Sequence, residues 1–370
     1  MVANPTRPAP LLPPGTYIEE WLEDNEGMTQ TKLASRLGVS IKHLNQLIRG
    51  HVRISTEMAT KLALVTGYSV DFWLTQQARY EARRAQIKVA EEDVAIVKSL
   101  LPTECISRLR AAGLITCTWR NPEQLILELY RLCKVASCKA IALVMKEQLT
   151  AVYRQSTAFN VKIGQQWAWL KIVKSHASKV EDIPAFDSQR LCNIVPELRA
   201  LTRNDPETFV EVVRAKLHTA GVIFIAEPDI SGARMGGVSF DHYGTPVIAV
   251  TDKQKREDVF WFTLFHEIAH VLNGDHDIGS VNYDNASGDR SEIEQQADQK
   301  GAEMLLPAAS IACLKGPYSL EKVEQLAEHE GISPAIVVGR LQHAQKVKHS
   351  WGRKLIRRFE ISQETAVSSG

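Results

Sequence analysis

Apolar residues recur at helical spacing near the start of the chain, with polar residues between them. The first set predicts a helix that ends near Gly27, and it consists of Tyr17, Ile18, Trp21 and Leu22. The second set predicts a short helix that Thr29 caps, with inward residues Leu33, Ala34 and Leu37.

A glycine turn and a third helix complete this pattern. Gly38 supplies the tight turn, and Ser40 caps the helix that follows. The inner stripe of that helix is predicted to hold Ile41, Leu44, Leu47 and Ile48. A short helix, a glycine turn and a second helix with a buried stripe predict a helix-turn-helix.

The pattern stays helical to about Arg203 and then changes. Trp167, Trp169 and Met145 are expected in the core, and this middle stretch is interpreted as a connector that spaces two functional ends. After a helix from Phe209, the run 222–225 predicts a β-strand, and 238–240 with 246–250 predicts a hairpin. An apolar helix around residues 262–272 follows.

Composition describes a globular protein with a core, because 44% of the 370 residues are hydrophobic and 24% are charged. The six cysteines contain no C-x-x-C pair, so they are expected as reduced thiols in a cytoplasmic protein. No apolar run approaches the length of a membrane span, so no membrane partner is expected. The proline-rich residues 1–14 are interpreted as a flexible leader rather than a signal peptide.

Net charge is only +1, so any binding of nucleic acid must depend on a local patch. Such a patch exists, because residues 29–53 contain basic residues and no Asp or Glu. A basic face suits DNA phosphates, and Asn or Gln on the second helix can recognise adenine edges. The candidate DNA contacts are Gln30, Ser40, Lys42, His43, Asn45, Gln46, Arg49 and Arg53. The alternative is a helical hairpin with a solvated basic face.

Several separate motifs between Pro14 and Glu81 resemble the HigA-type antitoxin branch of the XRE helix-turn-helix family. They are Thr29-Gln30, Leu33-Ala34, 37–40, 48–50, 54–59, Phe72-Trp73-Leu74 and 77–80. The resemblance implies a five-helix domain, often a homodimer, that binds a palindromic double-stranded operator.

The most specific chemical motif is His266-Glu267-Ile268-Ala269-His270, which reads H-E-x-x-H. On a helix, histidines four residues apart share one face and can bind one Zn²⁺ ion, with Glu267 beside them as the catalytic base. The alternative is a buried helix with two hydrogen-bonded histidines. A third ligand downstream would argue against that alternative.

Two carboxylates downstream fit such a site. Glu294 and Asp298 are spaced one helical turn apart and share a face. Glu294 is the predicted third zinc ligand, and Asp298 is predicted to accept the free N–H of a ligating histidine. Glu292 is the alternative ligand, and a solvated helix face is the alternative to both roles.

The stretches 261–270, Glu294 with Ala297-Asp298, 302–307 and 331–341 look like the ImmA/IrrE family of zinc endopeptidases. The resemblance covers about Phe209 to Gln345 and implies a gluzincin-like protease that cuts a helix-turn-helix repressor. This chain departs from the family at Lys300, where an aromatic residue is more frequent, and at Asp298, where Asn is frequent.

Three further features carry weaker predictions. The strand 247–250 is proposed as an edge for an extended substrate. A second oxyanion donor is sought among His242, Tyr243, His276 and Tyr283. The basic residues from Lys346 to Arg358 are interpreted as a solvated helix face, with a nucleic-acid or autoinhibitory contact as the alternative.

These observations predict an α+β, mostly helical protein. The expected domains are a leader (1–14), an XRE/HigA-like helix-turn-helix (15–85), a helical connector (86–205), an ImmA/IrrE-like zincin domain with a small sheet (206–345) and a basic tail (346–370). The leading hypothesis is a DNA-binding zinc endopeptidase that cleaves a repressor or antitoxin protein. The alternative is a non-proteolytic XRE-family regulator or antitoxin whose metallopeptidase fold serves as a sensor or dimerisation domain.

Overall fold

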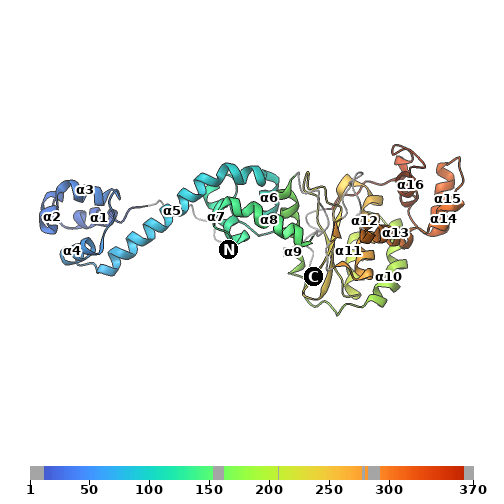
Figure 1. The fold of residues 1–370 in the computed structure, drawn as a ribbon, viewed down its shortest axis with the longest axis horizontal. Helices are drawn as coiled ribbons and strands as arrows, with labels where there is room; N and C mark the ends of the chain where they lie inside the picture. Colours follow the sequence, from blue (N-terminus) through green and yellow to red (C-terminus); the bar gives the residue numbers. More distant parts are fainter. Residues whose placement is uncertain (1–11, 153–161, 207, 277–279, 282–291, 362–370) are drawn as a thin grey trace. The chain divides into compact units, whose positions relative to one another are not determined.

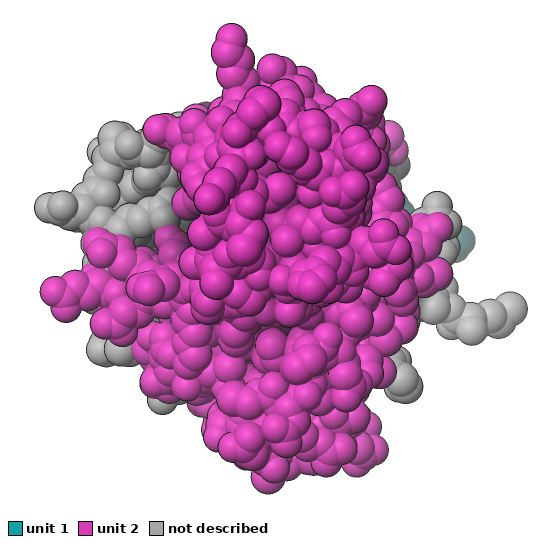
Figure 2. Space-filling view, turned by 90° about the vertical axis from the view of Figure 1, so that its right-hand side faces the viewer, with its two compact units in different colours: residues 1–94, 122–127 teal, residues 95–121, 128–370 magenta. Residues whose placement is uncertain are grey.

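A computed structural model describes residues 12–152, 162–206, 208–276, 280–281 and 292–361 (Figure 1). The chain divides into two compact units, residues 1–94 with 122–127 and residues 95–121 with 128–370 (Figure 2). Helices dominate and one small sheet accompanies them, so the prediction of a mostly helical α+β protein is confirmed. Most of the predicted leader, and Tyr283, lie outside the described residues.

The first unit begins with four short helices around one core. They are α1 (Thr16–Asp24), α2 (Gln30–Leu37), α3 (Ile41–Ile48) and α4 (Thr56–Thr66), followed by the start of α5 (Val70–Leu100). The core contains Ile18, Leu33, Leu44 and Trp73, each 0% exposed. The predicted boundary between residues 85 and 86 lies within α5.

The predicted turn of the helix-turn-helix is confirmed in its details. Thr29 Oγ1 accepts a hydrogen bond from Lys32 N (3.3 Å), and Ser40 Oγ accepts one from His43 N (3.1 Å). Gly38 has a φ of 68°, which glycine adopts without the steric cost that a Cβ adds. The inward position predicted for Ile41 is wrong, because its side chain is 45% exposed in the first turn of α3.

The later helices are α6 (Thr103–Ala111), α7 (Pro122–Cys133), α8 (Cys138–Val152), α9 (Ile163–Ala177), α10 (Ser188–Ala200), α11 (Phe209–Thr219), α12 (Glu257–Asn273), α13 (Glu292–Leu305), α14 (Ala308–Cys313), α15 (Leu320–Glu330) and α16 (Pro334–His343). Short 3-10 turns are η1 (Leu201–Arg203), η2 (Lys253–Lys255) and η4 (Arg353–Leu355). None of the helices within the described residues has both the length and the apolar character needed to cross a bilayer. All six cysteines are free thiols, as predicted.

The sheet has the strand order β1-β3-β2-β4. Its strands are β1 (Ile223–Ala226), β2 (Gly237–His242), β3 (Thr245–Val250) and β4 (Ser280–Val281). The predicted strand and hairpin are confirmed as β1 and β2–β3. The edge predicted for 247–250 is wrong, because β3 pairs in parallel with β1 on one side and antiparallel with β2 on the other.

Helix α12 is the central helix of the second unit and contacts β2, β3, α13 and α16 (Figure 1). Its sequence is apolar around most of its circumference, which is typical of a helix buried on several sides. Four of its large apolar residues are at most 1% exposed: Phe260, Trp261, Leu264 and Phe265. This packing fixes the helix that carries the H-E-x-x-H motif.

Helix α9 packs on this unit rather than acting as a spacer. Trp167 and Trp169 are 0% exposed, so their predicted core positions are confirmed, as is that of Met145. Trp169 Nε1 donates to the backbone oxygen of Glu227 (3.3 Å) at the end of β1. The spacer role is therefore wrong for α9, because its apolar residues are buried in long-range contacts.

Five of the six basic residues from Lys346 to Arg358 are exposed, as predicted, but no α-helix contains them, so the helical part of that prediction is wrong. Phe359 is 2% exposed, and its ring lies 4.7 Å from that of Phe260 and 5.0 Å from that of Phe209. Arg357 donates to the fully buried carboxylate of Glu257, with Nε 2.8 Å from Oε2. Apolar burial and this ion pair hold the segment against the start of α12.

Candidate metal centre

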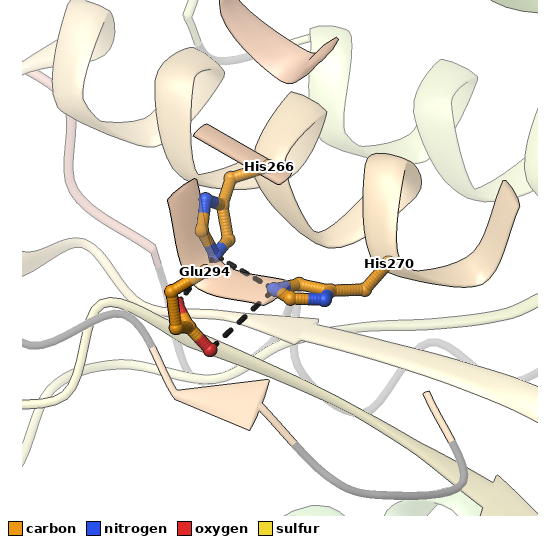
Figure 3. Close-up of side chains that lie close together, drawn as sticks. All are labelled: His266, His270 and Glu294. Carbon is orange, nitrogen blue, oxygen red and sulfur yellow. Dashed lines mark hydrogen bonds and ion pairs between the residues drawn. The ribbon is translucent and has the colours of Figure 1, made fainter. Parts of the chain in front are cut away.

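Two histidines of α12 face each other in the interior of the second unit (Figure 3). Their Nε2 atoms are 3.0 Å apart, and the residues His266 and His270 are 3% and 0% exposed. The i, i+4 spacing on a buried helix thus brings two imidazoles to one point.

Helix α13 brings a carboxylate to the same point (Figure 3). Glu294 Oε2 lies 3.3 Å from His266 Nε2, and Glu294 Oε1 lies 3.7 Å from His270 Nε2. One ligand atom from each of the three residues lies within 4.8 Å of the others. Glu292, the alternative ligand, is exposed at the start of α13 and is outside this cluster.

Gly301 permits the close approach of α13 to α12. A Cβ at residue 301 would lie 2.8 Å from the backbone oxygen of Phe265 and 2.9 Å from the Cα of His266. Because both atoms belong to the backbone of α12, a larger residue would push the helices apart. The glycine therefore helps to hold Glu294 near the histidines.

The outer nitrogens of both imidazoles contact carboxylates. His266 Nδ1 is 2.9 Å from Asp298 Oδ1, and His270 Nδ1 is 2.8 Å from Asp275 Oδ1. An ionised carboxylate only accepts hydrogen bonds, so each Nδ1 carries a proton, and each Nε2 is the atom that offers a lone pair to a cation when it is unprotonated. Two lone pairs and a carboxylate that converge in a buried space fit a cation, and His-His-Glu is a ligand set that Zn²⁺ uses in hydrolases.

Asp275 was not found by the sequence analysis. Gly274 ends α12 in the left-handed conformation (φ 75°), and the Asp275 N–H donates back to His270 O (3.2 Å). This turn directs the carboxylate toward the imidazole one turn earlier. The available signal was an acidic residue directly after the glycine that ends the motif helix.

Glu267 lies beside the cluster and is 0% exposed. Burial raises the pKa of its carboxyl to about 7, although the charges of His266 and His270 and a hydrogen bond from Ser239 oppose that rise. Ser239 is a second residue that the sequence analysis missed, because only the register of β2 brings it to the motif helix. A carboxyl with a pKa near neutrality suits a group that takes and returns a proton.

The pKa of His266 is raised as well, but by hydrogen bonds and charge instead of by burial. Burial lowers this pKa, but hydrogen bonds to Asp298 and Glu294 and the charge of Glu267 outweigh that effect and raise it to about 10. Without a metal, a proton therefore stabilises the cluster. A metal cation would take the place of that proton.

The oxyanion candidates are scattered. Tyr243 is 95% exposed in the turn between β2 and β3, and the His242 ring lies 4.8 Å from it. His276 follows α12, and its ring lies 6.4 Å from that of Phe186. None of the described candidates is part of the three-residue ligand cluster.

The predicted DNA contacts lie on α3 and directly beside it, except for Gln30, which begins α2, and Arg53, which precedes α4. Ser40, Lys42 and Arg49 are exposed, whereas Gln30, His43, Asn45 and Gln46 are half-buried. Arg53 is exposed too, but its Nε lies 3.8 Å from Glu81 Oε1, a pairing that the sequence analysis missed. The buried side of α3 holds Leu44, Leu47 and Ile48, so its polar side faces outward from the core of the first unit.

Comparisons with known proteins match two separate segments of the chain. Residues 18–73 match the helix-turn-helix family, and residues 222–342 match the IrrE N-terminal-like domain family. The chain is 26% identical over 99 residues to Virulence-associated protein I of Dichelobacter nodosus, a match that covers 27% of this chain and 87% of that protein. The chain thus joins a helix-turn-helix of the DNA-binding kind to a metallopeptidase-like IrrE-type domain.

Proposed function

We propose that this protein is a DNA-binding regulatory zinc endopeptidase that cleaves a repressor or antitoxin protein and so relieves transcriptional repression. The observation that carries the proposal is the convergence of His266 Nε2, His270 Nε2 and a Glu294 oxygen beside the buried Glu267. Buried lone pairs in this arrangement need a cation. The adjacent carboxyl is the group that peptide hydrolysis needs.

Zinc would be held by His266, His270 and Glu294, and when bound it lowers the pKa of water and polarises the peptide carbonyl. Glu267 takes a proton from the attacking water and returns it to the leaving amine. Asp298 and Asp275 keep the Nδ1 protons in place, which fixes the orientation of both rings and raises the basicity of Nε2.

The DNA-binding role rests on α3. We infer that its outward residues enter the major groove of a palindromic operator and that Lys42 and Arg49 contact phosphates or bases. A palindrome requires two copies, so the proposed assembly is a homodimer acting in the cytoplasm. The HigA-type resemblance favours a toxin-antitoxin, stress or phage setting for this control.

Co-expression with each protein encoded next to this one tests the proposed function. Wild type should produce defined fragments of one neighbour by mass spectrometry, and Glu267→Gln, which keeps all three ligands, should produce none. Both proteins should contain one zinc ion by elemental analysis.

Two results would contradict the proposal. Equal cleavage by wild type and Glu267→Gln would remove Glu267 as the base. Intact neighbours with zinc-loaded wild type would favour the alternative, a non-proteolytic XRE-family regulator whose metallopeptidase fold is a sensor or dimerisation domain.

A further inference from the structure

A pocket of about 270 Å³ runs along α12 and reaches His266, one of the three candidate ligands. Thr263, His266 and Asp298 line it at that end. Gly339 and Arg340 of α16 line it as well. Sites for drug-sized ligands usually have about 300–1,000 Å³, so this pocket suits one side chain or a small anion.

One arginine of the pocket, Arg256, already has hydrogen-bond partners within the protein. Arg256 donates to both carboxylate oxygens of Asp258, with distances of 3.0 and 2.6 Å. Arg256 Nη2 also donates to Gln342 Oε1 (2.9 Å). This guanidinium is therefore held by the protein itself and leaves little capacity for a ligand.

Arg340 differs from Arg256. Its side chain is half-buried, and within the described residues its guanidinium makes no hydrogen bond and no ion pair within 4.0 Å. Burial lowers the pKa of Arg340, and the more distant charge of Glu303 opposes this only in part. A partly desolvated guanidinium with five unused donors is poised for an anion, and its planar fork matches a carboxylate.

We propose that this pocket binds an acidic side chain of the protein substrate, a Glu or Asp next to the bond that is cleaved, and that Arg340 selects it. The inference rests on the proposed function: His266 lines the pocket, so a side chain held there would belong to a residue next to the carbonyl that the proposed metal polarises. Arg340 is then a specificity-determining residue. Glutamine in the same place would lose the charge-assisted pair.

The test uses two peptide hydroxamates that share a backbone and differ only in a Glu or a Gln side chain beside the metal-binding group. Each is titrated calorimetrically into the zinc-loaded full-length protein. Wild type should bind the Glu compound about tenfold or more tightly than the Gln compound. Arg340→Gln should lose this preference and keep its affinity for the Gln compound.

Arg203→Gln is the matched control, because it removes an exposed arginine outside the pocket and should keep the preference. Arg340→Lys should keep part of it, since one charge remains without the fork. Zinc content and circular dichroism show whether each variant is folded. If Arg340→Gln does not fold, the wild-type comparison still tests the preference for an acidic side chain, and Arg340→Lys tests the role of Arg340.

Each outcome separates this inference from the function on which it rests. Equal wild-type affinities, or a preference that survives Arg340→Gln, would overturn the inference alone. If neither hydroxamate binds the zinc-loaded protein, both the inference and the proposed peptidase fail. Glutarate, a free dicarboxylate, is titrated in the same way. If it binds as tightly as the Glu compound, the pocket binds a free anion and not a side chain of the substrate.

Discussion

At the scale of single residues, the candidate site consists of two imidazoles whose outer nitrogens are fixed by carboxylates. Spacing alone predicts the facing histidines, and it places Glu294 and Asp298 on one side of α13. It does not predict Asp275, whose position depends on the left-handed turn at Gly274. It does not predict Ser239 either, because that hydrogen bond depends on how β2 lies on α12.

Asp298 should control the pH dependence of metal binding. In the metal-free protein the pKa of His266 is raised to about 10, with Asp298 as the strongest contributor to the rise against the opposing effect of burial. Below that pKa a proton competes with zinc, so the apparent zinc affinity should rise about tenfold per pH unit until the pKa is reached. Asp298→Asn removes the negative charge and lowers the pKa, so the rise should end at a lower pH.

Competition with a chelator between pH 6 and 9.5 measures this effect. Asp298→Asn should also bind zinc about 10–100-fold more weakly at the upper end, because the imidazole loses basicity. Glu324→Gln removes one exposed negative charge on α15 and should leave the pH profile unchanged. Identical profiles for wild type and Asp298→Asn would exclude this role for the aspartate.

At the scale of elements, local patterns predict the structure well where local sequence determines it. The capped helices of the helix-turn-helix and the β2–β3 hairpin follow from neighbouring residues. The prediction that 247–250 is an edge strand is wrong because β1 joins the sheet by a parallel, non-local pairing with β3. The predicted helix in the tail is wrong because Phe359 is buried against aromatic residues far away in the sequence.

The ion pair between Glu257, at the start of α12, and Arg357 should contribute strongly to stability. Glu257 is fully buried and accepts hydrogen bonds from the Arg357 backbone N–H (2.9 Å) and Nε (2.8 Å). Arg357→Ala would leave this carboxylate without its guanidinium. The free energy of unfolding should fall by about 3 kcal/mol, the lower end of the range for breaking a buried pair, because Arg357 itself is partly exposed.

Urea unfolding followed by tryptophan fluorescence measures this loss. Arg358→Ala is the neighbouring control, since Arg358 pairs with Glu360 on the surface and its removal should change stability little. Equal losses in the two variants would show that the buried pair has no special importance for α12.

At the scale of the whole molecule, one chain carries a basic helix-turn-helix and a candidate metal centre in separate compact units. The two matched segments, residues 18–73 and 222–342, do not overlap. The net charge of +1 gives no sign of nucleic-acid binding. The local charge does, because the acidic residues of the first unit lie outside the stretch from Thr29 to Arg53.

Binding to DNA should therefore depend on a few cations of the first unit and not on the metal centre. Replacing Lys42 and Arg49 with Ala removes two exposed charges of the helix-turn-helix. If both contact phosphates in each copy of the proposed homodimer, four contacts are lost, and the slope of log affinity against log salt concentration should become shallower by about 3.6, because each contact contributes about 0.9. Fluorescence anisotropy with a 30-base-pair duplex over a range of salt concentrations measures the slope.

Arg203→Ala with Lys315→Ala removes the same charge from exposed sites of the second unit and should leave the slope unchanged, as should Glu267→Gln. An unchanged slope for the Lys42 and Arg49 variant would exclude α3 as the DNA-contacting helix.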